Sequence, residues 1–175
     1  ANTREFVKKI EAFDAKRHQE YALWMEESNA ENEKAVLMLK KMADLSKKEP
    51  EKYARLAAFY EGKSTSAVVA LLEEEMTAFR EFRHAFENGR RLVKKLGEMA
   101  AADIEGAEAT TLIEESEKQG AFVCRLPGAG GGDSIAALCL SKESQQKLKA
   151  FWQEKGVQLL DVQGSDEGVR QETEE

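Results

Sequence analysis

Four of the twelve glycines in this 175-residue chain fall within five positions, in the segment Pro127-Gly128-Ala129-Gly130-Gly131-Gly132-Asp133. Glycine adopts positive φ angles readily and lets a ligand approach the main chain closely. Successive amides in such a segment can turn inward and form a concave binding site for an anion. The apolar runs at 121–124 and 135–140 flank the glycines and predict two short buried strands. The glycines therefore indicate a shaped loop between strands and not a flexible linker.

Residue types alone leave two interpretations of this loop open. It is not a P-loop, because no Lys-Ser or Lys-Thr follows the glycines, and it is not a dinucleotide-binding loop, because it leads into a strand. Either its amides hold a phosphate, or the glycines only permit a tight turn. Asp133 would repel a bare anion, and it fits better if a Mg²⁺ ion or a lysine intervenes. Arg125 could supply positive charge, or it could be a solvated strand residue.

Composition limits the class of protein. With 42% hydrophobic and 34% charged residues, the chain can bury the core of one ordinary domain. A net charge of −7 argues against a nucleic-acid binder, which needs a basic face. No apolar run approaches the roughly 20 residues that span a bilayer. Cys124 and Cys139 are expected to be free thiols of a cytosolic protein, although a disulfide between neighbouring strands is conceivable.

Hydrophobic periodicity predicts helices first and strands later. Apolar residues at helical spacing are followed by breaks near Ser28-Asn29, Pro50, Gly62 and Gly97, and Arg17 interrupts the first apolar stripe. The expected helices are 3–29, 35–46, 50–60, 68–97, a shorter one ending at 119, and one around 148–152. The expected strands are 121–125, 134–140 and 157–162.

This order predicts an α+β fold in which helices pack on one face of a small antiparallel sheet. We expect one domain over residues 1–163, helical over 1–119 and β-loop-β-α-β over 120–163, followed by a disordered acidic tail at 164–175. Three strands make a thin sheet, and the chain has no initiator Met. We therefore expect Ala1 to lie within a loop of a longer protein whose preceding strand completes a β-α-β-β-α-β arrangement.

The segment from Arg125 to Ser134, followed by Ile135-Ala136-Ala137-Leu138, resembles the third conserved motif of the GHMP small-molecule kinases. An Asp after the glycines is most similar to the phosphomevalonate kinases among them. Ile104-Glu105, the helix at 111–113 and Gly120 resemble the family's approach to this motif, and 148–160 resembles its ending. Residues 1–7 are similar to the Ser-Ala-Asn/Ser-Thr-x-x-x-Val turn of its C-terminal domain.

Three positions depart from the family pattern. Pro127 stands where many bacterial members have Ser or Thr, so no hydroxyl can contact a phosphate there. Arg125 stands where Lys is common, which keeps the charge but changes its geometry. Ser134 replaces a frequent Cys.

The resemblance implies a ferredoxin-like GHMP kinase C-terminal domain, which is the substrate side of the enzyme. The implied phosphate-binding set is Gly128, Ala129, Gly130, Gly131, Gly132 and Asp133 with Arg125. The implied reaction is transfer of the ATP γ-phosphate, with Mg²⁺, to 5-phosphomevalonate in the cytoplasmic mevalonate pathway of isoprenoid biosynthesis.

In this family the glycine-serine nucleotide loop and the catalytic Lys and Asp lie in an N-terminal domain, and no Pro-x-Gly-x-Gly-x-Ser-Ser occurs here. We therefore expect no catalytic residue in this chain, no kinase activity from it alone, and the N-terminal kinase domain as its partner. Two alternatives stay open: another GHMP kinase such as mevalonate kinase, or a non-enzymatic helical binding module.

The remaining candidates have simpler structural interpretations. His18 and His84 have no metal ligands at the usual spacing, and Glu73-Glu74-Glu75 is expected to be a solvated face. Trp24 and Trp152 are expected in the core, and Ser64-Thr65-Ser66 is expected to cap a helix. The basic strip Arg80, Arg83, Arg90 and Arg91 is expected to pair with Glu81 and Glu87. An open sheet edge is expected to be covered by a missing segment or by self-association.

Overall fold

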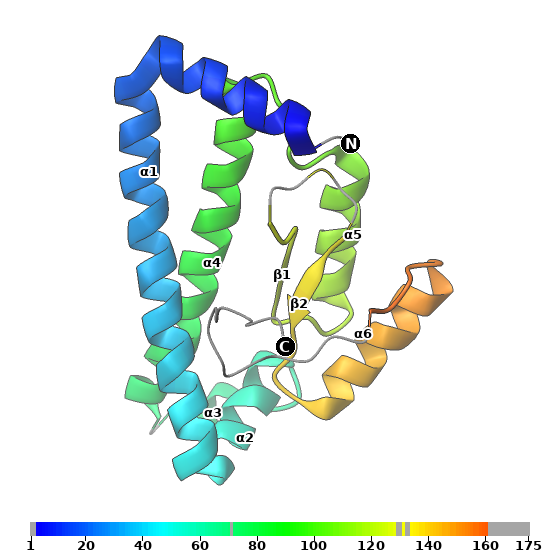
Figure 1. Cartoon of the computed structure of the whole chain (residues 1–175). Helices are drawn as coiled ribbons and strands as arrows, with labels where there is room; N and C mark the ends of the chain where they lie inside the picture. The colour runs from blue at the N-terminus through cyan, green and yellow to red at the C-terminus, as the bar shows by residue number, and fades with distance from the viewer. Residues whose placement is uncertain (1–2, 71, 129–130, 132–133, 161–175) are drawn as a thin grey trace, which may run out of the picture.

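The computed structural model describes residues 3–70, 72–128, 131 and 134–160, and Figure 1 shows their arrangement. The helices are α1 (Thr3–Lys48), α2 (Pro50–Tyr60), α3 (Ser66–Val69), α4 (Glu73–Met99), α5 (Ala107–Lys118) and α6 (Lys142–Glu154); the strands are β1 (Val123–Arg125) and β2 (Ala136–Leu138). The mainly helical chain with a small antiparallel sheet confirms the predicted α+β class. No helix in the described part of the chain is long and apolar enough to cross a membrane.

The long helices α1 and α4 lie side by side and run in opposite directions (Figure 1). Apolar residues recur every three or four positions on α4, and this stripe is buried. It includes Phe79, Phe82 and Leu92. Phe79 is fully buried and contacts the rings of Tyr53, Tyr60 and Phe122. This aromatic cluster joins α2 and α4 to the start of the hairpin.

A kink at Arg17 divides α1 into two segments. Arg17 has φ −137° and ψ 47°, which lie outside the helical region. The segment before the kink folds across the end of α4 (Figure 1). There Phe6 and Phe13 are buried in one cluster with Leu96 and Ile104. The kink thus places an apolar lid over the turn that leads from α4 to α5.

The hairpin carries apolar residues on both faces. β1 and β2 pair antiparallel with Val123 opposite Leu138 and Cys124 opposite Ala137. Val123 and Leu138 pack with α4 and α2, whereas Cys124 and Ala137 pack with α5 and α6. Helices therefore cover both faces of the hairpin, which becomes the centre of the fold.

Two predicted helix boundaries and one predicted strand were wrong. α1 continues through Ser28, which is buried against the rest of the fold, so packing against α4 outweighs the weak helix preference of Ser and Asn. The helix predicted over 68–97 is divided into α3 and α4. Residues 157–160 form no strand, and the rest of that predicted strand, with the predicted tail, lies outside the described residues.

Most smaller predictions were confirmed. Pro50 is the first residue of α2, where its missing N–H costs nothing. Both cysteines are free. Trp24 and Trp152 pack against apolar clusters, and their ring N–H groups donate to Leu92 O (2.7 Å) and Ser116 Oγ (2.8 Å). Thr65 occupies the N-cap position of α3, although its side chain makes no capping hydrogen bond.

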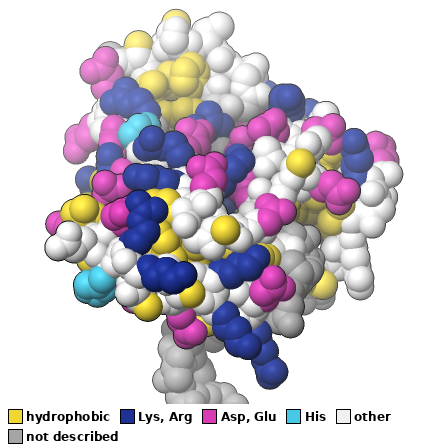
Figure 2. All heavy atoms as spheres, turned by 90° about the horizontal axis from the view of Figure 1, so that it is seen from above, with side chains coloured by type: hydrophobic (Ala, Val, Ile, Leu, Met, Phe, Trp, Pro, Cys, Tyr) yellow, Lys and Arg dark blue, Asp and Glu magenta, His cyan; other side chains and the backbone are white. Residues whose placement is uncertain are grey.

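Charges of both signs are interspersed on the surface. Figure 2 views the molecule from above Figure 1 and shows Lys and Arg side chains next to Asp and Glu side chains, without a broad field of one sign. Such a surface fits the net charge of −7 and offers no extended basic face to a nucleic acid on this side.

Candidate functional site

The glycine segment begins directly after β1, at the end of the hairpin near the start of α5 (Figure 1). Gly128 and Gly131 have φ angles of +64° and +97°, which L-residues with side chains rarely adopt. The Gly131 amide donates a hydrogen bond to the Ile104 carbonyl oxygen at 2.9 Å. Ala129, Gly130, Gly132 and Asp133, which belong to the predicted phosphate-binding set, lie outside the described residues.

Arg125 stands at the start of this segment with its charge available. Its guanidinium carbon lies 5.3 Å from the centroid of the Phe86 ring, and its Nε makes a long hydrogen bond of 3.5 Å to Leu126 O. A Cβ added at Gly89 would lie 3.8 Å from Arg125 Nη1, an ordinary contact distance, so the guanidinium lies against the buried Gly89 of α4. Among the described residues Arg125 has no carboxylate partner. A guanidinium held in this way suits an anionic ligand such as phosphate.

A buried carboxylate organises the charges beside Arg125. Glu105, whose side chain is 4% exposed, accepts hydrogen bonds from Arg90 Nε (2.9 Å) and Nη2 (2.5 Å). The Thr110 hydroxyl donates to it at 2.8 Å, and Lys94 Nζ lies 3.5 Å away. Burial alone would raise the pKa of Glu105, but the hydrogen bonds from Arg90 and Thr110 outweigh it and lower the pKa. Glu105 is therefore a stable anion that joins α4 to the start of α5.

These groups meet around one small hollow of about 20 Å³. It is lined by Arg90, Val93, Ile104, Glu105, Arg125, Leu126 and Gly128. The structure thus brings together Arg125 and Gly128 from the predicted set, with Gly131 attached through Ile104. Among the described residues the lining of this hollow thus carries two guanidinium groups, Arg90 and Arg125, and one carboxylate, Glu105.

Two arginines of the basic strip on α4 pair with the predicted glutamates, and the other two have different partners. Arg80 and Arg83 lie 4.0 Å and 3.9 Å from Glu81 and Glu87, as predicted. Arg83 also donates to Phe122 O at 3.0 and 3.2 Å. Arg90 instead pairs with Glu105, and Arg91 donates to Asn88 Oδ1 at 3.2 Å. The prediction from helical spacing missed Arg90 because its partner lies 15 residues away, beyond the end of α4.

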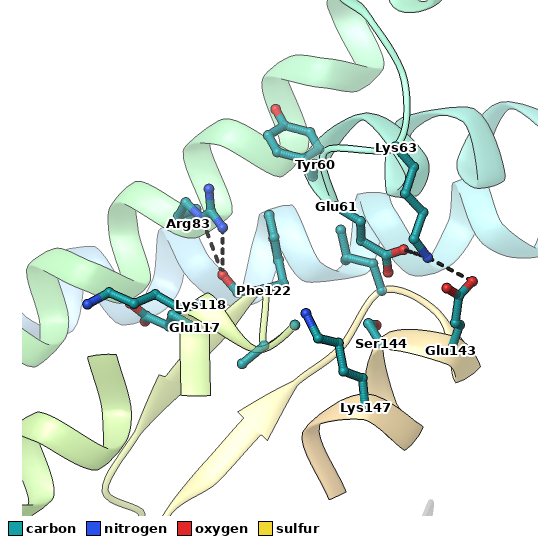
Figure 3. Close-up of a pocket in the computed structure, with 13 residues that line it drawn as sticks. Tyr60, Glu61, Lys63, Arg83, Glu117, Lys118, Phe122, Glu143, Ser144 and Lys147 are labelled. Atoms are coloured by element: carbon teal, nitrogen blue, oxygen red, sulfur yellow. Dashed lines mark hydrogen bonds and ion pairs between the residues drawn. The ribbon is translucent and has the colours of Figure 1, made fainter. Parts of the chain in front are cut away.

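A second pocket, of about 170 Å³, lies at the opposite end of the hairpin, where Phe122 precedes β1 (Figure 3). Lys63 spans its mouth and pairs with Glu61 and Glu143 at 2.8 Å each. Burial opposes ionisation of Glu61, but hydrogen bonds from Lys63, Ser141 and Ser144 lower its pKa. The two ion pairs of Lys63 join the turn after α2 to the start of α6, which is a structural role, although Glu61 Oε1 is buried without a hydrogen-bond partner among the described residues.

Metal coordination finds no support in the described part of the chain, where no three His, Cys, Asp or Glu side chains are grouped closely enough to hold an ion. A phosphate ligand fits better, because Arg125 lies next to glycines with positive φ and pairs with no carboxylate in the part of the chain that the structure describes.

Comparison with known proteins identifies the family of this chain. The family model described as "GHMP kinases C terminal" matches residues 67–158, which is more than half of the chain. The chain belongs to this family. The matched region contains α4, the Glu105 network, the whole hairpin and α6. The second pocket extends beyond this region to Tyr60, Glu61 and Lys63.

Two curated relatives are phosphomevalonate kinases. The phosphomevalonate kinase of Saccharolobus solfataricus is 42% identical over 62 residues, which are 35% of this chain and 18% of that protein. The peroxisomal phosphomevalonate kinase of Arabidopsis thaliana is 34% identical over 90 residues, which are 51% of this chain and 18% of that protein. The similarity thus spans about a fifth of each relative. No solved structure matches the chain.

The Glu105 network is the part of the site that residue patterns missed. Ile104-Glu105 entered the resemblance to the family only as the approach to the glycine motif. The only sequence signal for this network was the position of Glu105, which directly precedes Gly106 at the start of a helix. That pattern suggests a cap at a helix N-terminus, but it cannot show that Arg90 of α4 is the partner.

Proposed function

We propose that this chain is the C-terminal, substrate-side part of an ATP-dependent phosphomevalonate kinase. The reaction would transfer the ATP γ-phosphate to the phosphate of 5-phosphomevalonate, giving 5-diphosphomevalonate and ADP. The observation that carries the proposal is the guanidinium of Arg125, which has no carboxylate partner among the described residues. It is held over Phe86 beside glycines of positive φ, in a chain similar to two phosphomevalonate kinases.

In this proposal the chain's own residues bind and orient phosphate. Arg125 supplies a fork of N–H donors to a phosphate oxygen pair, and the glycine segment lets the main chain approach that group. Phosphoryl transfer depends mainly on positioning and on charge neutralisation, so these contacts are the chain's contribution to the rate. A bound Mg²⁺ ion would neutralise charge on the ATP phosphates; no described residue is assigned to it. An N-terminal kinase half would supply the nucleotide loop and the catalytic Lys and Asp.

The proposal includes a cytoplasmic location. The free thiols of Cys124 and Cys139 support it, because reducing compartments keep cysteines unpaired. The domain boundaries of 1–163 for the folded part and 164–175 for an acidic tail belong to the same proposal.

A substrate titration tests the proposed activity. A full-length protein that joins this chain to an N-terminal kinase half is assayed for ADP release with 5-phosphomevalonate or mevalonate as acceptor. We expect turnover with 5-phosphomevalonate. Turnover with mevalonate alone would instead assign the protein to a sister GHMP kinase, and absence of turnover with both would favour a binding module.

Two substitutions test the predicted phosphate site in that assay. Gly131→Val should abolish turnover, because a β-branched side chain cannot adopt φ +97° without strain and would crowd the segment. Gly62→Val is the matched control, since Gly62 also has positive φ (+71°) but has open space around its Cβ position. Full activity of Gly131→Val would show that the glycine segment is only a turn.

Arg125→Met should raise the KM for 5-phosphomevalonate at least about tenfold, the effect of losing a charge-assisted hydrogen bond of about 1.4 kcal/mol or more. Arg80→Met, an exposed arginine on α4, is its control. Equal KM values for the two variants would remove Arg125 from the site.

A further inference from the structure

The turn between α4 and α5 contacts the glycine segment through one backbone hydrogen bond. The Gly131 amide donates to Ile104 O at 2.9 Å. This amide is thereby used inside the protein, so Gly131 anchors the segment instead of offering its N–H to a ligand. The position of the Ile104 carbonyl then decides where Gly131 lies.

Packing fixes Ile104 from one side. Its side chain is 4% exposed and lies in the cluster formed with Phe6, Phe13 and Leu96. A Cβ at Gly97 would lie 3.4 Å from Ile104 Cγ1 and only 2.6 Å from Ala102 O, so the turn lies tightly against α4. Apolar packing can hold the side chain in this way, but it leaves the direction of the following peptide groups less restricted.

Hydrogen bonds that Glu105 accepts fix the turn from the other side. Glu105 follows Ile104 directly, and its carboxylate binds Arg90 of α4 through two N–H groups and Thr110 of α5 through its hydroxyl. A bidentate guanidinium–carboxylate pair restrains orientation as well as distance. Because Arg90 is 19% exposed and Glu105 is 4% exposed, water competes weakly for these bonds.

Resting on the proposed function, we propose that Glu105 is a positioning residue for the phosphate-binding segment. Glu105 holds Arg90 and Thr110, this clamp orients the Ile104 carbonyl oxygen, and that oxygen fixes the Gly131 amide. Glu105 itself contacts no ligand. The arrangement also separates two arginines by role: Arg90 belongs to the clamp, and Arg125, which has no carboxylate partner among the described residues, is left for a phosphate group of the substrate or nucleotide.

The first test observes the hydrogen bond directly and needs no ligand. The scalar coupling across the hydrogen bond between Gly131 N and the Ile104 carbonyl carbon is measured by NMR in the 175-residue chain. We expect the coupling in the wild type and its loss in folded Glu105→Gln. Glu81→Gln is the matched control, because it removes an equivalent carboxylate of α4 that pairs with Lys34, and it should retain the coupling. An unchanged coupling in Glu105→Gln would overturn the proposal.

The second test measures the consequence for catalysis in a full-length kinase carrying this chain. Glu105→Gln should lower kcat at least about tenfold, equivalent to about 1.4 kcal/mol, and Glu81→Gln should leave kcat unchanged. A purely structural role would lower the melting temperature without changing kcat of the folded enzyme, and that result would overturn the proposal. If the wild type turns over no substrate, the proposed function fails, whereas the NMR result still decides the role of Glu105 in holding Gly131.

Discussion

Two carboxylates near α5, Glu105 and Glu117, have pKa values shifted in opposite directions. Burial is the largest influence on both and raises the pKa. For Glu105, direct hydrogen bonds from Arg90 and Thr110 outweigh burial, so its pKa is lowered. Glu117 interacts with Arg90 only through the electrostatic attraction of the two charges, without a hydrogen bond, and its pKa remains raised. Arg90 thus stabilises the ionised form of Glu105, which it binds, but does not offset the cost of burying the ionised form of Glu117.

The lowered pKa of Glu105 predicts a pH-dependent contribution to stability. A carboxyl whose pKa is lower in the folded state stabilises the fold above its unfolded pKa, and this contribution is lost as pH falls through the folded value. Glu105→Gln should therefore reduce the free energy of unfolding by about 1–3 kcal/mol at pH 7, because Arg90 loses its charged partner. Urea denaturation at pH 7 and near pH 3 should show this deficit shrinking in acid; a deficit independent of pH would contradict the assigned charge.

The raised pKa of Glu117 predicts the reverse behaviour. Such a group stabilises the fold fully below its unfolded pKa, and the contribution disappears as pH rises through the folded value. At pH 7 Glu117 is therefore mildly unfavourable, and Glu117→Gln should stabilise the chain by up to about 1 kcal/mol. Thermal unfolding should give a higher Tm for the variant at pH 7 and nearly equal Tm values at pH 4. A lower Tm at pH 7 would show that the charged form is needed.

At the scale of elements, the turn between α5 and β1 depends on Gly120. Gly120 has φ +119°, and a Cβ there would lie 3.2 Å from Ser144 O at the start of α6. Gly120→Ala combines backbone strain with a close contact and should cost about 2–4 kcal/mol. Gly62→Ala meets only the strain of φ +71° and should cost about 1–2 kcal/mol. Denaturant unfolding of both variants measures the loss of unfolding free energy. Equal losses would mean that α6 shifts away from the added methyl group at no cost.

Local patterns predicted the elements well where a single strong signal marks their ends. Pro50 begins α2, Gly120 follows α5 and Gly156 follows α6, each at a position where backbone geometry favours that residue. The interruption of the apolar stripe at Arg17 was visible in the sequence, and the kink of α1 lies there. The predicted break at Ser28-Asn29 failed because α4 packs along α1 and supplies contacts that no local pattern contains.

In the candidate site, too, local features were predictable from the sequence and tertiary contacts were not. Glycine spacing identified the segment and Arg125, because positive φ and a nearby cation are local features. The hydrogen bond from Gly131 to Ile104 and the pair Arg90–Glu105 join residues 27 and 15 positions apart. They depend on how the α4–α5 turn meets the hairpin, which only the folded chain determines. Local patterns thus locate a glycine-rich loop more readily than the residues that hold it in place.

At the scale of the whole molecule, three apolar clusters surround the hairpin and support both of its ends. One joins α2, α4 and one face of the strands, another joins the lid segment of α1 to the α4–α5 turn, and the third joins α5 and α6 to the other face. In the described part of the chain β1 and β2 pair only with each other, so each has an outer edge. Self-association through such an edge remains a prediction that sedimentation of the purified chain tests.

The last prediction concerns the activity of the chain alone. Phosphoryl transfer needs the two phosphate groups aligned and their charge neutralised from several directions. The described residues place one guanidinium, that of Arg125, beside the glycine segment, and no three His, Cys, Asp or Glu side chains among them are grouped closely enough to hold a metal ion. The purified 175-residue chain should therefore release no ADP from ATP above background when 5-phosphomevalonate is added.

A coupled ADP assay measures this, with Gly131→Val as the background control and circular dichroism to show that both chains are folded. ADP release that requires 5-phosphomevalonate and is absent from Gly131→Val would mean that this chain carries a complete active site. Such a result would contradict the division of labour proposed above, since the catalytic groups would then lie among these residues and not in an N-terminal half.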